Sequence, residues 1–416
     1  MFKNSLWIIF EVFSRYFLNF FGLIVLSAYF SLEEFGEYSF VFSYVTIFSG
    51  FIFLGIDRIV IARLQDVKNK IITVTSYLLL KLFGSVIATV AAIIIYVFYY
   101  NTTSSFNYIV IVLISQIILS VLAYETLFIV NLKSEILNRY KIFIPVTVFL
   151  LKILGVYKNF NIEYFFYLSI IESLLILIIF PFVLPKITEK LFVIDWVELK
   201  YLLKISWPLI IGVNIVYFNE KVFFVFLKKI LTNEIYGDFI FSFRLIEIFL
   251  MLLYSGSLSY VGSLRVKFRE SIQTLEDQII KYTEIINVFS LLVLLIIFCF
   301  SDFFYKTLFT KYDNIYLIYL SPLIFIFSNS VLKSLYFTVI EKDILLMYSA
   351  ILSFLVNIYL IGLIDLNTSV QKIALIIVFS FFFQNYLSTI FNSFGRRFVI
   401  VQLKSFLLIN LIKKIK

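Results

Sequence analysis

The sequence predicts an all-α, polytopic membrane protein with about twelve transmembrane helices in two six-helix lobes and both termini in the cytoplasm. The 416-residue chain is 62% hydrophobic and only 15% charged, whereas a soluble domain has about 45–50% apolar and about 25% charged residues. Its mean hydropathy is +1.03. The apolar residues form continuous runs instead of alternating every second residue, which excludes a transmembrane barrel.

Apolar runs long enough to cross the hydrocarbon core, which takes about 20 residues, recur along the whole chain. The first half contains runs near 5–30, 36–56, 72–99, 107–130, 142–157 and 163–184. The second half contains runs near 202–227, 236–262, 283–300, 315–340, 343–364 and 371–391. The run 142–157 is short and carries Lys152. The first run is too long for a cleavable signal peptide, and Glu11 and Arg15 interrupt it.

The distribution of basic residues between the runs predicts the orientation. One alternate set of segments holds only Lys158, Lys228, Lys229, Lys306, Lys311 and Lys372, and the other set holds most of the remaining Lys and Arg. Because basic residues accumulate in cytoplasmic loops, we expect the basic set, with both termini, to lie inside. This also explains the formal charge of +9 without nucleic-acid binding.

Composition excludes several kinds of chemistry. The chain has no histidine and a single cysteine, Cys299, so His-based zinc sites, His proton relays and an intramolecular disulfide are ruled out. The longest loops, near 185–201 and 263–282, are too short to form a domain, and the phosphate-binding pattern G-x-x-x-x-G-K-[ST] is absent. We therefore expect no cofactor, and a driving force that is a proton gradient, a sodium gradient or the substrate gradient itself.

A weak internal repeat supports the division into two lobes. At an offset of 201 residues, Ser5, Tyr16, Phe17, Leu26, Glu33, Gly36, Phe40 and Phe42 align with Ser206, Tyr217, Phe218, Leu227, Glu234, Gly237, Phe241 and Phe243. Transporters built from such parallel repeats place the substrate between the halves. We expect an N-terminal lobe over 1–185, a cytoplasmic linker over 186–201, a C-terminal lobe over 202–392 and a basic interfacial tail over 393–416.

Two arginines inside the apolar runs are the strongest candidates for substrate binding. An ionisable residue at the bilayer centre costs at least about 2.5–3.5 kcal/mol, so its presence needs a reason. Arg15 shares a helical face with Glu11, and Arg244 shares one with Glu247. The planar guanidinium fits phosphate oxygens. One such arginine in each lobe predicts a cavity for an anionic headgroup.

Further polar residues in the runs are candidates for two roles. Substrate binding is expected of Lys81, Lys221, Asn214 and Asn219, and coupling to an ion gradient of Glu11, Glu125, Glu172 and Glu247. A carboxylate near a cation can change its protonation as a cavity changes sides. Structural alternatives stay open. Lys152, Glu172, Glu220 and Lys333 can be neutralised pairs or can reach the headgroups, and the two asparagines can join helices.

Short motifs occur in order along both halves of the chain. In the first half they are Asn4-Ser5-Leu6-Trp7, the turn LEEFGEYS at 32–39, and FLGID at 53–57 followed by Arg63. In the second half they are LKISWPL at 203–209, NEIYG at 233–237, FRLIE at 243–247, then Leu308, Phe309, Tyr312 and Asn357. Together these motifs resemble those of Wzx-type polysaccharide flippases, which belong to the superfamily of multidrug, oligosaccharidyl-lipid and polysaccharide exporters.

The resemblance implies movement of undecaprenyl-diphosphate-linked oligosaccharide repeat units, for O-antigen, capsule or a similar polysaccharide, from the inner to the outer leaflet of the plasma membrane. It implies two six-helix lobes around a cationic cavity that alternates its opening, with cavity cations at Arg15 and Arg244. It also implies a polysaccharide polymerase and a chain-length regulator as partners. Such flippases often carry Arg-x-Asp in the seventh span; here Lys221 keeps the cation but Phe223 replaces the acid.

Three other functions stay open. A multidrug or other small-molecule antiporter could use the same scaffold, although cations in the runs are at least as numerous as acids. A membrane-embedded polysaccharide polymerase or glycosyltransferase usually has a large external loop or a sugar-nucleotide domain, and neither is present here. A non-transporting scaffold would need pairing for its buried charges but no water-filled cavity.

Overall fold

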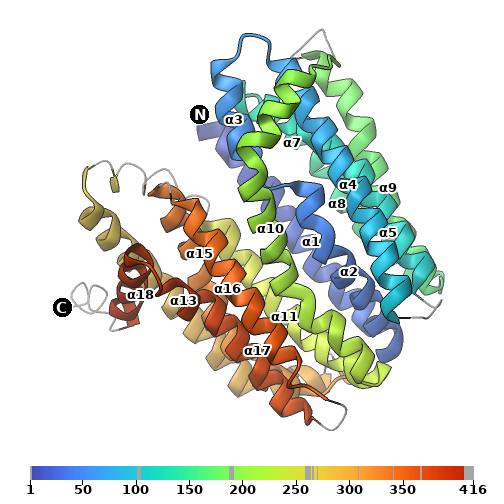
Figure 1. Ribbon diagram of the computed structural model, residues 1–416. Helices are drawn as coiled ribbons and strands as arrows, with labels where there is room; N and C mark the ends of the chain where they lie inside the picture. The colour runs from blue at the N-terminus through green and yellow to red at the C-terminus, as the bar shows by residue number, and fades with distance from the viewer. Residues whose placement is uncertain are drawn as a thin grey trace. The chain divides into compact units, whose positions relative to one another are not determined.

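The computed structural model describes residues 2–100, 105–186, 192–257, 264, 267–268, 270–307, 309–340, 342–365 and 368–406. Within these ranges all regular secondary structure is helical (Figure 1). Nine of the helices formed by these residues are long and apolar enough to cross a membrane. The prediction of an all-α, multi-pass membrane protein is confirmed. The number of crossings and the side on which the termini lie stay predictions.

A helix or a pair of helices covers each predicted span. In the first half these are α1 (Phe2–Tyr29), α2 (Leu32–Phe53), α4 (Lys70–Tyr100), α5 (Phe106–Ile118) with α6 (Glu125–Val130), α8 (Phe143–Tyr157) and α9 (Ile162–Val183). In the second half they are α10 (Trp196–Ile230), α11 (Asn233–Ser257), α13 (Ile272–Thr307), α14 (Asn314–Leu320) with α15 (Pro322–Val339), α16 (Asp343–Ile361) and α17 (Val370–Asn385).

The structure also contains helices outside the predicted spans. Short α3 (Asp57–Asp66) and α7 (Ser134–Lys141) lie in predicted cytoplasmic loops, and α18 (Ser393–Phe406) lies in the basic tail, where an interfacial helix is predicted. Helix α7 continues into α8, which lengthens the short fifth span. The fourth span is interrupted by a 3₁₀ turn, η1 (Leu119–Tyr124), so Glu125 begins a new helix instead of lying inside one. Apolarity alone cannot reveal such breaks.

By its contacts the chain divides into two compact units, Met1–Lys229 and Ile230–Lys416. The first unit contains α10 and most of the predicted linker 186–201, of which residues 187–191 lie outside the described ranges. The lobe boundaries at 185 and 201 stay a prediction. In the text below, "first unit" and "second unit" refer to this division, and each unit is described by itself.

Glycines allow two helices of the first unit to approach α2 closely. A Cβ atom on Gly84 of α4 would lie 2.1 Å from the carbonyl oxygen of Phe51, and one on Gly50 would lie 2.6 Å from the Cα of Asn214 in α10. No side chain fits at these distances, so each backbone contact requires glycine. Small residues at such crossings are typical of helix packing in membranes, where close van der Waals contact replaces the hydrophobic effect.

Replacing Gly84 with alanine is therefore expected to destabilise the first unit. Overpacking of this kind costs about 1–3 kcal/mol, and here the obstacle is backbone, which cannot rotate away. The thermal midpoint of the detergent-solubilised protein should fall by several degrees. Gly362→Ala is the matched control, because its Cβ would lie 3.3 Å from the nearest atom, the Tyr359 oxygen. Equal midpoints for the two variants would contradict the account of the α2–α4 contact.

Buried amides and hydroxyls connect three helices of the second unit. Asn329 Nδ2 of α15 donates to Asn287 Oδ1 of α13 at 3.1 Å, and Asn287 Nδ2 donates to Ser405 Oγ of α18 at 3.2 Å. Gln402 Nε2 of α18 donates to the backbone oxygen of Asn329 at 3.1 Å. One face of α18 is thus packed against α13 and α15. Whether the basic face of this helix meets the membrane surface, as predicted for 393–416, stays a prediction.

Lys333 has a structural partner in this unit. Its ammonium donates to the Gln384 carbonyl at 2.8 Å and to Ser349 Oγ at 3.1 Å, and the residue is 6% exposed. Gln384 lies in the last turn of α17, where carbonyls lack partners within the helix and a cation is stabilised by the helix dipole. The structural interpretation of Lys333 is therefore favoured over cargo binding.

Candidate functional site

The interior of the first unit brings four charged residues together from α1, α6 and α7. Glu11 Oε1 lies 3.5 Å from Arg15 Nε and 3.8 Å from Lys141 Nζ. Lys141 also donates a hydrogen bond to Glu125. The side chains of Glu11 and Lys141 are 5% and 10% exposed, whereas that of Arg15 is 39% exposed. Glu11 therefore lies between two cations, one buried and one partly exposed.

A second group of polar contacts joins α3 to α4. Asp57 Oδ1 accepts a hydrogen bond of 2.6 Å from the Tyr77 hydroxyl and lies 3.7 Å from Lys81 Nζ. The Lys81 ammonium also lies 4.6 Å from the centre of the Tyr77 ring. Both Lys81 and Tyr77 interact electrostatically with Glu125, which links this group to the first.

Lys152 and Glu172 complete this set, from α8 and α9. They interact electrostatically with each other, and Glu172 also interacts with Arg15. Lys152 reaches α1, where its Nζ would lie 3.3 Å from a Cβ added to Gly22. We define the interior charge cluster as four carboxylates and four cations, listed here: Glu11, Asp57, Glu125, Glu172, Arg15, Lys81, Lys141 and Lys152.

The cluster is balanced rather than cationic. Each of its cations interacts with a carboxylate of the set, so no charge in it is buried alone, which would be very costly in a low-dielectric interior. Arg15 differs from the other cations in two ways. Its side chain is 39% exposed, more than those of Lys81 and Lys141. Its Nε atom is buried and makes no hydrogen bond to any described residue. Arg15 is the cation best placed to accept a new anionic partner.

The sequence reasoning missed three members of this arrangement. Asp57 and Lys141 were assigned to cytoplasmic loops, and Tyr77 was passed over as one aromatic residue among many. The signal for Lys141 was available, since residues 134–141 can be added to the short fifth span to give a span of ordinary length. The helical segment long and apolar enough to cross a membrane here is Ser134–Tyr157.

In the second unit, Arg244 and Glu247 of α11 form the pair expected from their spacing. Arg244 Nη1 donates to Glu247 Oε2 at 2.8 Å, and the two side chains are 20% and 15% exposed. This pair is closer than the Arg15–Glu11 pair. Each unit thus contains an arginine paired with a carboxylate one helical turn away, as predicted.

The candidates on α10 are buried within the first unit. Asn219 is fully buried and Lys221 is 7% exposed. Asn214 donates from Nδ2 to the Ile210 carbonyl at 2.7 Å and packs against Gly50 of α2. That contact favours the helix-packing interpretation of Asn214. Its Oδ1 atom is buried without a hydrogen bond to any described residue.

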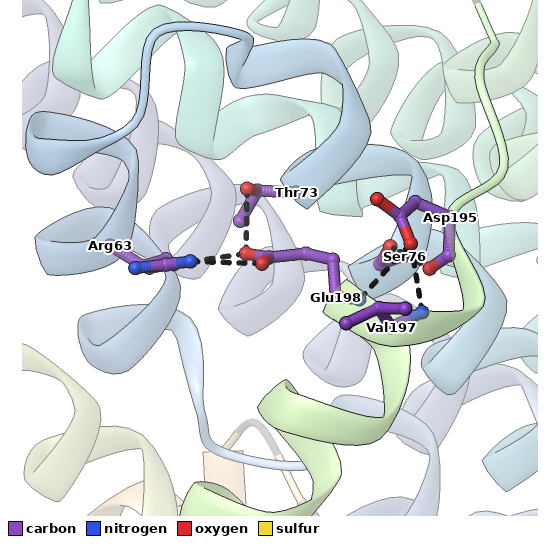
Figure 2. A network of polar contacts seen from close by, with 6 residues as sticks. All are labelled: Arg63, Thr73, Ser76, Asp195, Val197 and Glu198. Atoms are coloured by element: carbon purple, nitrogen blue, oxygen red, sulfur yellow. Dashed lines mark hydrogen bonds and ion pairs between the residues drawn. The ribbon is translucent and has the colours of Figure 1, made fainter.

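The N-terminal end of α10 is held to α3 and α4 by an ion pair (Figure 2). Arg63 donates from Nε and Nη2 to the two carboxylate oxygens of Glu198, each at 3.0 Å, and Thr73 Oγ1 donates to Glu198 Oε1 at 2.9 Å. Asp195 caps the helix by accepting from the backbone N–H of Val197 at 2.8 Å. The hydrogen bond to Glu198 raises the pKa of the Arg63 guanidinium, so the pair persists wherever the carboxylate is ionised.

Reversing one charge of this pair should destabilise the α10 end, and reversing both should restore it. Arg63→Glu or Glu198→Arg leaves like charges facing each other and a polar group without its partner, which costs about 1–3 kcal/mol. We expect a lower thermal midpoint for each single variant and most of the loss recovered in the double variant. The control is the exposed pair Lys267–Glu270, whose side chains are 41% and 48% exposed and whose reversal should change little. A double variant no more stable than the singles would contradict the pairing.

Comparison with solved structures identifies the fold. The chain is similar to a multidrug resistance MATE family transporter of the MOP superfamily in its inward-facing conformation, with a TM-score of 0.73, 12% identity, and 94% and 95% of the two chains covered. It is similar to the lipid II flippase MurJ in an inward closed conformation, with a TM-score of 0.69, 13% identity, and 100% and 93% covered.

A third similar structure is a MOP superfamily transporter from Pyrococcus furiosus, for which reverse polarity of the binding pocket suggests a different function. Its TM-score is 0.67 at 13% identity, with 96% and 95% of the chains covered. No protein-family model matches this sequence, and no curated protein matches it. The chain has the fold of MOP superfamily transporters over nearly its whole length.

Proposed function

We propose that this protein moves undecaprenyl-diphosphate-linked oligosaccharide repeat units from the inner to the outer leaflet of the plasma membrane, and that Arg15 contacts the diphosphate. The observation that carries the proposal is the state of Arg15. Its side chain is partly exposed, it lies 3.5 Å from Glu11, and its Nε makes no hydrogen bond to a described residue. A phosphate oxygen can replace that loose contact with short, charge-assisted hydrogen bonds.

The headgroup is the part of the cargo that needs a protein in order to cross the membrane. A diphosphate with several sugars cannot cross about 30 Å of hydrocarbon unaided, whereas the polyprenyl tail can stay in the lipid. Arg15 supplies a planar donor for phosphate oxygens, and Arg244 is the corresponding candidate in the second unit. Lys81, Lys221 and Asn219 are the further candidates for headgroup and sugar contacts.

The carboxylates of the cluster can couple movement of the cargo to an ion gradient. When phosphate approaches Arg15, Glu11 loses part of its neutralising charge and its affinity for a proton or a sodium ion rises. Glu125, Glu172 and, in the second unit, Glu247 are in comparable positions beside cations. Binding of the cargo and binding of the ion would thus depend on the same charges.

A second candidate is a multidrug or other small-molecule antiporter. The observation that favours it is the equal number of carboxylates and cations in the interior charge cluster, because a balanced cluster can bind a cationic drug as well as an anionic lipid. The MATE family likeness in fold agrees with this alternative.

Depletion of the protein in its own cells separates the two functions. For the flippase we expect lipid-linked repeat units to accumulate in the inner leaflet and surface polysaccharide to disappear, with unchanged sensitivity to cationic dyes. For the antiporter we expect the opposite: normal polysaccharide and higher dye sensitivity. The genes beside its own should, for the flippase, encode a polysaccharide polymerase, a chain-length regulator and glycosyltransferases.

A further inference from the structure

A cavity of about 530 Å³ lies in the second unit at the C-terminal end of α13 and the start of α14. We call it the α13–α14 cavity. Its walls come from the end of α13 (Asp302, Tyr305, Lys306), the connecting loop and one residue of α11, Asp238. Ligand pockets commonly have volumes of about 300–1,000 Å³. The charge distribution predicts that this end of the unit faces the outside.

Backbone and side-chain hydrogen bonds give the cavity a defined shape. The Asp313 backbone N–H donates to both carboxylate oxygens of Asp238 at 3.0 Å, and Asp313 itself caps α14 by accepting from the Ile315 N–H at 3.0 Å. Asp238 is 8% exposed. Asn314 donates to Asp302. The connecting loop is therefore fixed to both helices it joins and to α11.

Aromatic rings form another part of the wall. The Tyr312 ring stacks on Phe241 of α11 with centroids 3.9 Å apart. The Tyr305 hydroxyl lies 3.2 Å from Ser242 Oγ. These contacts hold both tyrosines in place, and because the two residues are 5% and 7% exposed, only a small part of each reaches the cavity.

The chemistry of the lining selects among possible ligands. The accessible charges of the lining balance, because Asp302 and Asp313 are exposed beside Lys306 and Lys311, whereas Asp238 is 8% exposed and accepts from the Asp313 N–H. The lining therefore has no excess of cations for a diphosphate. Among the described residues no group of three or more Asp, Glu, Cys or His is arranged to hold a metal ion. Its carboxylates, amide and hydroxyls instead match a sugar, whose many hydroxyls donate and accept hydrogen bonds.

We propose that the α13–α14 cavity binds one or two neutral or amino sugars of the cargo's glycan on the outer side of the membrane. This inference rests on the proposed function, because the glycan is the part of that cargo which reaches the outside. The two parts of the headgroup would then bind at different places. The diphosphate binds at arginines, and the sugars bind at this cavity as they leave.

The test uses the full chain in lipid nanodiscs with a fluorophore at the cavity. Cys299 is the only cysteine, so Cys299→Ser provides a background in which Thr310→Cys, an exposed lining residue, carries a bimane label. The probe is a fraction of two to four sugars from an acid hydrolysate of the cells' own surface polysaccharide. We expect a saturable fluorescence change with this probe, and none with pyrophosphate or Mg²⁺.

Asp302→Asn should weaken the response roughly ten-fold, because the amide oxygen can still accept the hydrogen bond from Asn314 that fixes the loop, whereas the charge that makes a hydrogen bond to a sugar worth about 1.5–3 kcal/mol is lost. Lys306→Ala is a second probe of the same wall. Asp277→Ala, an exposed position on the same helix outside the cavity, should leave binding unchanged. A response to Mg²⁺ alone, no saturable response to the sugars, or equal binding by wild type, Asp302→Asn and Lys306→Ala would overturn the proposal.

Flipping measured on the same preparation separates this proposal from the proposed function. Sugar binding without movement of lipid-linked oligosaccharide supports the cavity and contradicts the flippase. Movement without sugar binding contradicts the cavity and leaves the flippase standing.

Discussion

Replacing Arg15 with alanine is expected to lower the rate of transbilayer movement of lipid-linked oligosaccharide by roughly 10- to 100-fold. The estimate follows from the loss of charge-assisted hydrogen bonds to the diphosphate, worth about 1.5–3 kcal/mol. Arg15→Lys should retain part of the rate, since it keeps the charge but loses the planar fork. The measurement is initial rate in proteoliposomes containing equal amounts of each variant.

The fold should survive this substitution. Arg15 is 39% exposed and its ion pair with Glu11 is long, at 3.5 Å, and Glu11 keeps Lys141 as a partner. The matched control is Arg396→Ala, because Arg396 is an exposed arginine of α18. If Arg15→Ala flips at the wild-type rate with the same thermal midpoint, the site assignment is wrong.

Replacing Glu11 with glutamine should have the second largest effect, and on a different quantity. Glu11 contacts both Arg15 and Lys141 and is 5% exposed, and glutamine has the same shape without the charge. Removing one partner of a buried ion pair costs about 3–5 kcal/mol; here the cost is smaller because the Arg15 side chain is 39% exposed and Lys141 keeps Glu125. We therefore expect a folded but less stable protein.

The informative readout for Glu11→Gln is the dependence of flipping on an imposed gradient. With a proton or sodium gradient across the proteoliposome membrane, the wild type should accelerate several-fold, whereas the variant should keep its basal rate and lose the acceleration. Glu270→Gln serves as a control, because Glu270 is exposed and pairs with Lys267, three residues before it. An unchanged response of Glu11→Gln to both gradients would remove Glu11 from the coupling scheme.

The apolar runs were sufficient to predict the fold class, because the length and hydropathy of a span are local properties of the sequence. The pairs Glu11–Arg15 and Arg244–Glu247 were predictable for the same reason, since each lies on a single helix. Asp57 and Lys141 were not predictable in this way. Their partners, Lys81 and Glu11, lie in other helices, and only tertiary packing brings them within 4 Å.

The structure also changes the interpretation of particular charges. Lys333 lies within an apolar run, yet it donates to the carbonyl of Gln384 in the last turn of α17, which ends at Asn385, inside the predicted run 371–391. Asn214 was a possible sugar contact, yet it packs against Gly50. The position of a charged residue within an apolar run does not show whether it binds the carbonyls at the end of a helix or faces a ligand.

We propose that this fold, with its arginine and carboxylate pairs, moves a lipid-linked diphosphate oligosaccharide. The most direct test is reconstitution of the purified protein in proteoliposomes with a fluorescent undecaprenyl-diphosphate oligosaccharide, followed by an enzyme added outside that acts only on exposed headgroups. We predict that the inner-leaflet pool becomes accessible with wild-type protein and much more slowly with Arg15→Ala. Equal accessibility in protein-free liposomes, or in wild-type and Arg15→Ala proteoliposomes, would contradict the account.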